Sequence, residues 1–331
     1  MDKLADIAIP QGLHSFLAEH GWAGAQVSLL AADASFRRYF RAVDGVRQAV
    51  IMDAPPPHED PKPFLNVAEY LSQSGLRAPR ILGLDLERGL LLLEDFGDVQ
   101  MREYLEVHPS EETAIYRNAI RVLAALATKP PADVPQYDMD IYLREVRLFN
   151  EWYVPAMGLA TRADAFDAVW TTALAPLAQQ EHQKTTVLRD YHAENIMLLA
   201  DGTQGIIDFQ DALLGHPAYD LVSLLQDARR DVSVELEAAM LEYYAAISNA
   251  DADFSAHYAL LGAQRNTKII GIFTRLWKRD GKARYLGFLN RMWTYLERDL
   301  AHPQLAELKA WFDLNVPQEI RRQMPDGAPI L

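Results

Sequence analysis

The sequence of 331 residues contains no cysteine and no long apolar run. Without cysteine, the chain forms no disulfide and has neither a thiolate nucleophile nor a cysteine-bound metal. Its apolar segments, of which 122–127 is an example, are far shorter than the roughly 20 residues that span a bilayer. The opening MDKLADIAIP also lacks the basic flank and apolar stretch of a secretory signal. These absences predict a cytoplasmic protein with no membrane partner.

Basic residues are in the minority, because 32 lysines and arginines face 46 acidic residues and the net charge is -14. This balance argues against a nucleic-acid partner, which requires a basic face. Half of the residues are apolar, as in ordinary soluble globular proteins. Segment 262–284 is a local exception, with seven basic residues and one acidic residue. It is either a solvated helix face or the wall of a pocket for an anionic ligand.

Short segments with β-branched and aromatic residues dominate the first hundred positions, and helical spacing dominates the rest. Predicted strands occupy residues 26–31, 36–43 and 47–53, a helix occupies 64–73, and a hairpin that turns at 87–89 follows. Further predicted helices occupy 139–156, 163–180, 218–229, 233–248, 254–278 and 283–300, with strands only within 185–208. The pattern predicts an α+β fold with a strand-rich N-terminal lobe, residues 1–96, and a larger helical C-terminal lobe, residues 97–331.

The stretch LRDYHAENIMLL, residues 188–199, places several polar side chains between apolar runs. Its last residues and segment 205–208 form two apolar strands joined through Asp201-Gly202, a strong signal for a two-residue hairpin turn. With those two residues at the centre of the turn, Asn195 lies opposite Asp208. Directly opposed side chains lie close together, and their oxygens suit magnesium, which needs only one or two protein ligands beside phosphate and water.

Asp190 precedes Asn195 by five residues, so the loop between them would leave Asp190 beside the metal as a base for an alcohol. A base, a metal-binding asparagine and a metal-binding aspartate are the groups that phosphoryl transfer from ATP requires. Taken singly, each of these residues would more simply stabilise loop backbone groups. The combination predicts phosphoryl transfer.

Two stretches, LRDYHAENIML and GIIDFQDALLGHPAYDLVSLL, resemble the catalytic and metal loops of the aminoglycoside phosphotransferase and choline kinase-like family. The resemblance implies a bilobal protein-kinase-like fold with ATP and Mg²⁺ as cofactors. It assigns Asp190 as the base and Asn195 and Asp208 as magnesium ligands. It also implies that Asp220 is a structural residue that holds the catalytic loop, and that the backbone from Glu94 to Phe96 binds adenine.

The third predicted strand departs from the kinase pattern, which places a phosphate-binding lysine there. The strand reads QAVIMDAPP, with Met52 in that position, and the first hairpin, LLAADASFRRYFRA, contains no glycine. Either the protein is a nucleotide-binding pseudokinase module, or another residue supplies the charge. The intact set around Asp190 favours the second explanation. The candidate ATP contacts in this region are Ser35, Arg38 and Arg41, and one of the two arginines would replace the lysine.

Longer stretches narrow the resemblance. DASFRRYFRA, IMDAPP, DFQDALLGHPAYDLVSLLQDARRDV and QRNTKIIGIFTRLWKRDGK are similar to the anomeric sugar kinases of peptidoglycan recycling. This similarity implies phosphorylation of the C1 hydroxyl of N-acetylmuramate and N-acetylglucosamine. Separately, we expect the protein to be a monomer. The alternatives are a kinase of another alcohol, such as an aminoglycoside, choline or homoserine, or the pseudokinase module. The candidate acceptor contacts are Arg189, His192, Asn150, Glu151, Arg265 and Lys268.

Arg265 and Lys268 belong to the basic segment 262–284, and they would meet the lactyl carboxylate of N-acetylmuramate. Aminoglycosides are polycations, which the same segment would repel. Arg189 and His192 are equally well explained as a surface arginine and as a histidine that stabilises the loop. Asn150 and Glu151 precede the aromatic pair Trp152-Tyr153 on a predicted helix. Core packing explains this aromatic pair at least as well as stacking on a sugar ring does.

Overall fold

The computed structural model describes residues 9–32, 36–179, 184–248, 250, 252–325 and 327–328. Contacts between backbone segments divide the chain into two compact units. The first unit consists of Met1–Val107 and Glu194–Asp211, and the second of His108–Ala193 and Ala212–Leu331. This grouping differs from the predicted lobes, 1–96 and 97–331, because the segment that contains Asn195 and Asp208 packs with the first unit. The lobe boundary stays a prediction.

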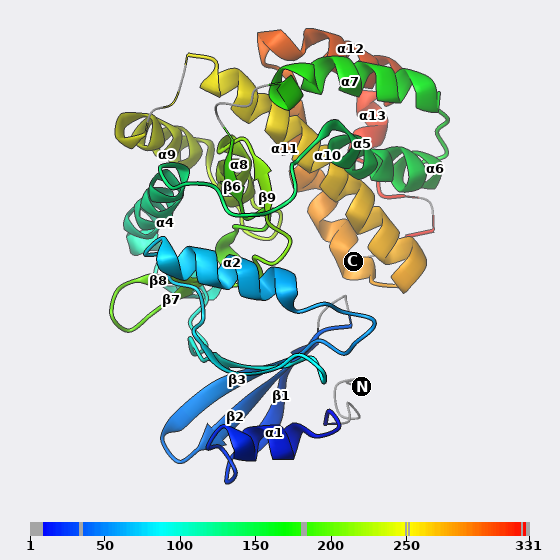
Figure 1. Cartoon of the computed structure of the whole chain (residues 1–331). Helices are drawn as coiled ribbons and strands as arrows, with labels where there is room; N and C mark the ends of the chain where they lie inside the picture. The colour runs from blue at the N-terminus through cyan, green and yellow to red at the C-terminus, as the bar shows by residue number, and fades with distance from the viewer. Residues whose placement is uncertain are drawn as a thin grey trace. The chain divides into compact units, whose positions relative to one another are not determined.

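A five-stranded antiparallel sheet with the order β1-β2-β3-β5-β4 forms the centre of the first unit (Figure 1). The strands are β1 (Gln26–Ala32), β2 (Arg38–Asp44), β3 (Arg47–Asp53), β4 (Ile81–Asp85) and β5 (Leu90–Glu94). The helices of this unit are α1 (Leu13–Glu19), α2 (Lys62–Gln73) and α3 (Met101–Val107). The predicted strands, the helix before β4 and the hairpin turn before β5 are confirmed.

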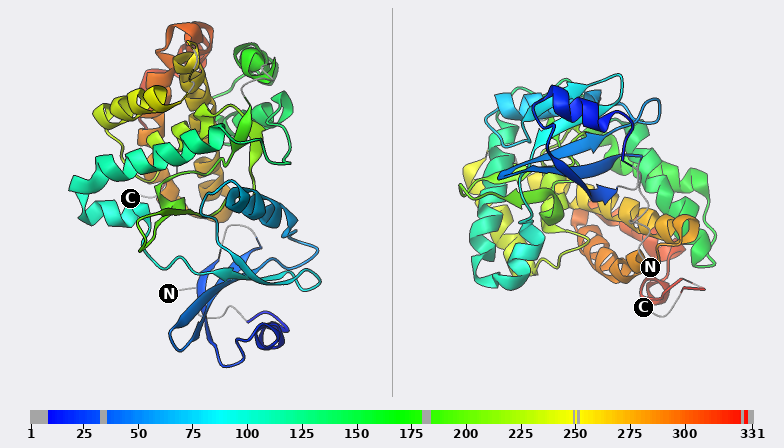
Figure 2. Two further views of the ribbon diagram at one scale, coloured as in Figure 1. Left: turned by 60° about the vertical axis from the view of Figure 1, so that its left-hand side comes forward. Right: turned by 90° about the horizontal axis from the view of Figure 1, so that it is seen from below.

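The two faces of this sheet have different neighbours, because successive side chains on a strand point to opposite sides. Helix α1 covers one face, where Phe16 and Leu17 pack with Phe40, Ile51 and Leu92 in a buried cluster (Figure 2). Helix α2 lies on the other side of the sheet. Residues of β2 with odd numbers therefore point away from α1.

The first unit also contains a hairpin of β7 (Ile196–Leu198) and β8 (Gln204–Ile206), and its register differs from the prediction. Ile196 pairs with Ile206, so Asn195 lies opposite Ile207, whose N–H donates to the Asn195 carbonyl at 3.1 Å. The turn has three residues instead of two, with Gly202 in the left-handed region at φ 80°. The Asp201 carboxylate stabilises this wider turn by accepting the N–H of Thr203 at 2.9 Å.

The second unit is mostly helical. Its helices are α4 (Glu112–Ala127), α5 (Met139–Leu148), α6 (Val154–Ala156), α7 (Ala163–Gln179), α8 (Ala218–Leu225), α9 (Val234–Ile247), α10 (Phe254–Asp280), α11 (Leu289–Leu300), α12 (Ala306–Asn315) and α13 (Gln318–Arg321). A π-helix, η2 (Phe149–Tyr153), continues α5, and the 3-10 helices of this unit are η1 (Pro109–Glu111), η4 (Ala283–Phe288) and η5 (Pro303–Leu305). Another 3-10 helix, η3 (Ala193–Asn195), begins at the last residue of the segment that ends at Ala193 and continues into the first unit. An antiparallel sheet and a largely helical remainder confirm the predicted α+β class.

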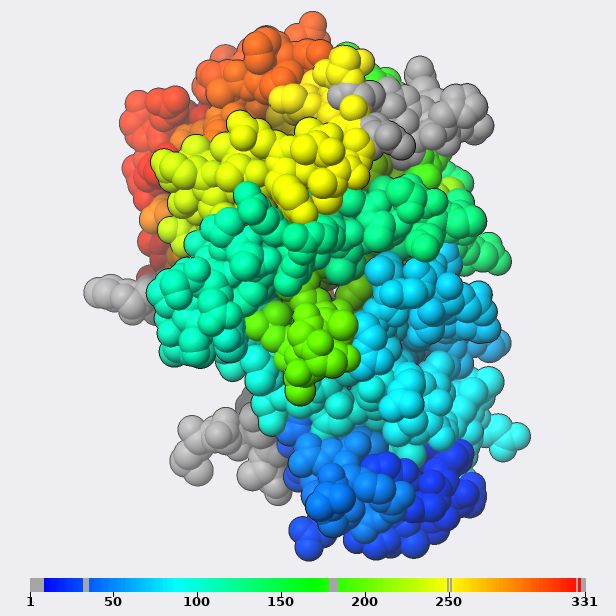
Figure 3. Space-filling model, turned by 90° about the vertical axis from the view of Figure 1, so that its left-hand side faces the viewer, coloured from blue at the N-terminus to red at the C-terminus, as the bar shows by residue number. Residues whose placement is uncertain are grey.

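Helix α10 is buried along most of its length and packs against α5, α8 and α11, which places its side chains at the centre of the second unit. Helices α4 and α9 lie side by side on one face of this unit, where Arg121 donates to the Tyr243 hydroxyl at 2.8 Å (Figure 3). Strands β6 (Thr185–Val187) and β9 (Leu213–Gly215) pair in a small sheet. Along the chain, β6 precedes the loop that carries Asp190, and β9 follows Asp208. In the described part of the chain, no helix is long and apolar enough to cross a bilayer.

Candidate active site

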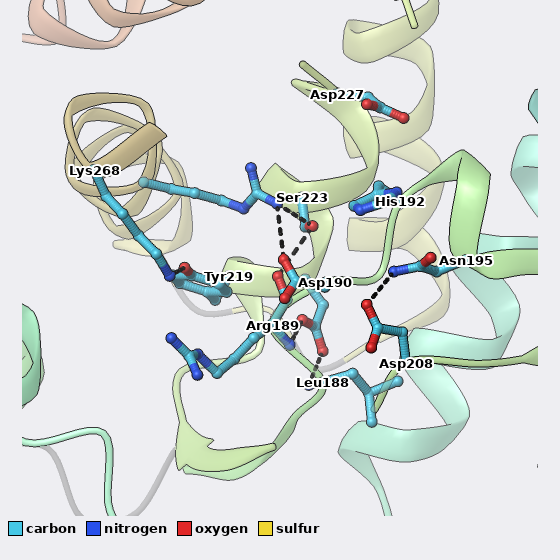
Figure 4. Close-up of polar contacts among 12 residues, drawn as sticks. Leu188, Arg189, Asp190, His192, Asn195, Asp208, Tyr219, Ser223, Asp227 and Lys268 are labelled. Atoms are coloured by element: carbon cyan, nitrogen blue, oxygen red, sulfur yellow. Dashed lines mark hydrogen bonds and ion pairs between the residues drawn. The ribbon is translucent and has the colours of Figure 1, made fainter. Parts of the chain in front are cut away.

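The loop that carries Asp190 is held by the start of α8. The buried Asp220 carboxylate accepts the backbone N–H of Leu188 at 2.7 Å and that of Arg189 at 2.8 Å (Figure 4). Burial raises the pKa of Asp220 to about 7, although both N–H donors oppose the shift. Arg189 has a φ of 70°, a conformation that residues other than glycine rarely adopt. Residues held in such conformations cluster at functional sites. The contacts of Asp220 therefore fix the backbone immediately before Asp190.

The Asp190 side chain is 47% exposed, so it is open to a ligand, and it faces cations from α10. Nη2 of Arg265 lies 3.7 Å from Oδ1 of Asp190. Burial would raise the pKa of the Asp190 carboxyl, but Lys268 and Arg265 hold that pKa below its ordinary value. Asp190 is consequently ionised at neutral pH, as a proton acceptor must be.

Glu145 on α5 is the partner of two predicted acceptor contacts, and the sequence analysis missed it. Its carboxylate is 5% exposed and accepts from the Arg189 guanidinium, from Lys268 Nζ at 2.8 Å, from the Tyr137 hydroxyl and from Gln264 Nε2 at 3.0 Å. The available signal was its position on the apolar stripe of α5, where a charged residue is rare unless it is paired.

The pKa of Glu145 gives a prediction for stability. Burial would raise it, but Lys268 and Arg189 lower it to about 2, well below the ordinary value of 4.5. The ion pairs therefore contribute stability above pH 4.5, and this contribution is lost as the pH falls toward 2. Glu145→Gln leaves both cations without their carboxylate, so we expect its free energy of unfolding at pH 7 to fall by about 3 to 5 kcal/mol.

Urea unfolding of the parent and of Glu145→Gln between pH 7 and pH 3 measures this effect, with Glu307→Gln, an exposed position on α12, as the matched control. The control should change the free energy by less than about 0.5 kcal/mol. The difference between parent and Glu145→Gln should shrink as the pH falls below 4.5. A difference that stays constant over this range would mean that Glu145 acts by packing alone.

His192 follows Asp190 on the same loop and lies in a buried network of polar contacts. Its Nε2 is 3.2 Å from Nη1 of Arg229, and Asp227 accepts the N–H of Ala193 at 3.1 Å. Burial lowers the pKa of His192, so the ring is neutral at pH 7. These surroundings suit a residue that stabilises the loop, and the acceptor role of His192 stays a prediction.

Asn150 and Glu151 lie in the π-helix η2, a rare type of helix that is frequent at functional sites. The Asn150 side chain accepts a hydrogen bond from the Thr161 hydroxyl, and Glu151 is exposed. The structure thus groups Arg189, Arg265 and Lys268 around Asp190 and Glu145, whereas Asn150 has a different partner.

In the first unit, Asn195 and Asp208 converge despite the changed register. Nδ2 of Asn195 donates to Oδ2 of Asp208 at 3.4 Å (Figure 4), and Gln210 Nε2 donates to Oδ1 at 2.8 Å. Asp208 lies two residues beyond β8 and has a φ of 60°, so its side chain does not follow the alternation of the strand. One amide oxygen and one carboxylate, both half-buried, form a donor set that fits magnesium.

These two residues also line a cavity of about 580 Å³ within the first unit. Its walls come from the sheet face away from α1, from the chain after β5 and from the β7-β8 hairpin. The lining residues include Leu30, Tyr39, Arg41, Val50, Phe64, Leu93, Glu94, Phe96, Asn195, Met197 and Asp208. An apolar cleft of this size suits a nucleotide, and it ends at the two residues predicted to bind magnesium.

The chain after β5 is fixed by arginines. The Glu94 carboxylate accepts from Arg77 at 3.1 Å and from Arg80 at 3.1 Å, and the guanidinium of Arg77 lies over the Phe96 ring. Burial would raise the pKa of Glu94, but these arginines lower it. The Phe96 ring also packs on Gly205, where a Cβ would lie 2.5 Å from the ring. The Glu94 side chain thus serves the fold, and the Glu94 N–H donates to the Arg80 carbonyl at 2.8 Å.

The two arginines proposed for phosphate binding point to opposite faces of β2. Arg38 lies on the α1 face and donates to Asp53 at 2.7 Å, whereas Arg41 lines the cavity and donates to Asp95 at 2.6 Å and to Asp98 at 2.7 Å. Met52 is fully buried. Of the two, only Arg41 faces the cavity, where its charge is matched by two carboxylates. Ser35 lies outside the described residues.

Comparison with known proteins agrees with this geometry. The model of the phosphotransferase enzyme family matches residues 26–258. A relative from Caulobacter vibrioides, named N-acetylmuramate/N-acetylglucosamine kinase, is 38% identical over 93% of this chain and 97% of its own. A relative of the same name from Pseudomonas aeruginosa is 38% identical over 95% of this chain and 93% of its own.

Solved structures share the fold. The choline kinase LicA from Streptococcus pneumoniae superimposes with a TM-score of 0.63 at 13% identity, covering 90% of this chain and 100% of its own. An ADP-bound aminoglycoside phosphotransferase has a TM-score of 0.59 at 14% identity and covers 88% of this chain and 99% of its own. These likenesses confirm the predicted kinase-like fold.

Proposed function

This chain belongs to the phosphotransferase enzyme family, and we propose that it transfers the γ-phosphoryl group of ATP to the C1 hydroxyl of N-acetylmuramate and N-acetylglucosamine. The observation that carries this proposal is the similarity to kinases of these two sugars along nearly the whole length of both chains. The ionised, accessible Asp190 supports catalysis and argues against a module that only binds nucleotide. A cytoplasmic location and a monomeric state belong to the same proposal.

Asp190 is the proposed base. One of its oxygens accepts the proton of the C1 hydroxyl while O1 forms a bond to the γ-phosphorus of ATP. The bond between that phosphorus and the bridging oxygen breaks, and the products are the sugar 1-phosphate and ADP. An anomeric hydroxyl is more acidic than a common alcohol, so a carboxylate of low pKa suffices to accept its proton.

Asn195 and Asp208 are the proposed ligands of Mg²⁺. When bound, the ion would neutralise charge on the phosphate oxygens during transfer. The amide oxygen of Asn195 and the carboxylate of Asp208 would hold it, and Gln210 would orient that carboxylate through its hydrogen bond to Oδ1. The cavity bounded by these residues supports the binding of ATP, with adenine against the backbone from Glu94 to Phe96.

Lys268 is the proposed contact for the lactyl carboxylate of N-acetylmuramate. It is partly exposed, and its Nζ lies 2.8 Å from Glu145 and 3.4 Å from the Tyr219 hydroxyl. A primary ammonium has three donors, so these two contacts leave one for the ligand. N-acetylglucosamine lacks the carboxylate, and it would bind without this interaction.

An acceptor panel tests the proposed function. We expect the protein with ATP and Mg²⁺ to release ADP with N-acetylmuramate and with N-acetylglucosamine. We expect the kcat/KM for kanamycin, choline and homoserine to be lower by roughly 100-fold or more. Loss of the reducing end during the reaction distinguishes transfer to C1 from transfer to another hydroxyl. Turnover of an aminoglycoside without turnover of either sugar would contradict the proposal, as would a product that keeps its reducing end.

A further inference from the structure

Arg265 lies on α10 and is buried, with its guanidinium beside Asp190. Only 4% of its surface is exposed, and Nη2 donates to the Ser223 hydroxyl at 2.8 Å while it lies 3.7 Å from Oδ1 of Asp190. Ser223 on α8 in turn donates to the carbonyl of Arg189 at 3.2 Å. One guanidinium group therefore contacts the Asp190 side chain directly and the preceding backbone through Ser223.

The hydrogen bonding of Arg265 is incomplete for a buried cation. Among the residues that the structure describes, its Nε and Nη1 have no hydrogen-bond partner. Arg321, which is 2% exposed, makes a contrast, because its Nε donates to Val316 at 2.8 Å and its Nη2 to Asp313 at 2.8 Å. Buried donors without acceptors cost stability, so fold stability alone gives no reason for an arginine at position 265.

The other titratable groups that face Asp190 have partners of their own. They are Arg189 and His192 on the loop, Lys268 on α10 and Asp220 on α8. Arg189 and Lys268 are paired with Glu145, His192 is neutral, and Asp220 holds two backbone N–H groups. Within the described residues, Asp190 is the only carboxylate at ion-pair distance from Arg265.

We propose that Arg265 is a positioning residue for the base: its guanidinium fixes the orientation of the Asp190 carboxylate and keeps it ionised. This inference rests on the proposed function, in which Asp190 accepts the proton of the sugar. It changes the role predicted from the sequence, where Arg265 was a contact for the acceptor carboxylate. A residue that acts through Asp190 affects both sugars equally, whereas a carboxylate contact would affect only N-acetylmuramate.

Two substitutions separate the charge of Arg265 from its shape. Arg265→Met removes the cation that lies 3.7 Å from the Asp190 carboxylate. Because a charge within about 6 Å shifts a pKa by roughly 1 to 3 units, the acid limb of the kcat-pH profile should move upward by about one unit or more. We expect kcat at pH 7 to fall about 10- to 100-fold with both sugars, with an unchanged KM for ATP. Arg265→Lys keeps the charge, so its acid limb should stay with the parent even where kcat is reduced.

Arg321→Met is the matched control, because it also removes a buried arginine from the second unit. It should lower the melting temperature without moving the acid limb. Melting temperature and ATP affinity are measured for every variant, so that misfolding is recognised. An acid limb that stays in place in a folded Arg265→Met protein would overturn the proposal, as would a loss confined to N-acetylmuramate. Full activity of Asp190→Asn would instead remove Asp190 as the base, and a parent protein that turns over neither sugar would overturn the proposed function.

Discussion

Replacing Asp190 with asparagine is expected to lower kcat by about 10²- to 10⁴-fold, the usual contribution of a positioned general base. The side chain keeps its size and one oxygen, but an amide does not accept the hydroxyl proton. The cavity that is proposed to bind ATP is lined without Asp190, so the dissociation constant of ATP should stay within about twofold of that of the parent. Single-turnover kinetics with N-acetylglucosamine and equilibrium binding of ATP measure the two quantities.

Asp231→Asn is a suitable control for this experiment. The Asp231 side chain is 83% exposed, and its ion pair with Arg291 is long, at 3.6 Å. Its substitution should therefore leave both quantities unchanged. Asp190→Asn with the parent's rate would mean that the proton leaves by another route. Loss of ATP binding in Asp190→Asn would mean that the loop, and not its carboxylate, is required.

Features that depend on neighbours in sequence were predictable. Short segments with β-branched and aromatic residues predicted the strands within residues 26–53, and the turn at 87–89 lies where glycine and charged residues interrupt two apolar runs. Asp190, Asn195 and Asp208 were predicted from their spacing, because the loop and the hairpin that carry them are local structures.

The hairpin register shows where local rules stop. Asp-Gly predicts a two-residue turn, but the Asp201 carboxylate binds the N–H of Thr203 and the turn widens by one residue. A shift of one residue turns each side chain to the other face. Asn195 and Asp208 still meet, because Asp208 has a positive φ beyond the strand, and no pattern in the sequence indicates that conformation.

Contacts between distant segments were not predictable from a single sequence. Glu145 meets Arg189 and Lys268, which lie 44 and 123 residues further along the chain. Arg265 meets Ser223 and Asp190 only because α10 packs on α8. The sequence showed that segment 262–284 is basic. It did not show that its first two cations point inward to carboxylates and not outward to solvent.

Burial accounts for the absence of a lysine at position 52. Met52 is fully buried, so a lysine there would place an ammonium group in an apolar environment.

The second large effect is expected at the proposed metal site, where Asp208→Asn removes the only carboxylate of the Asn195–Asp208 pair. An amide is a much poorer ligand for a hard cation, and a bound metal contributes several kilocalories per mole to phosphoryl transfer, so kcat/KM should fall by about 10³-fold or more at 1 mM Mg²⁺.

A magnesium titration distinguishes a metal ligand from a structural residue. If Asp208 binds the ion, raising the Mg²⁺ concentration should recover part of the activity of Asp208→Asn, whereas the parent is already saturated. Asp211→Asn is the matched control, since Asp211 is an exposed carboxylate three positions further along the same loop. Its activity and its magnesium dependence should equal those of the parent. Activity of Asp208→Asn that is low at every Mg²⁺ concentration, in a protein that still binds ATP and unfolds normally, would assign Asp208 a role other than metal binding.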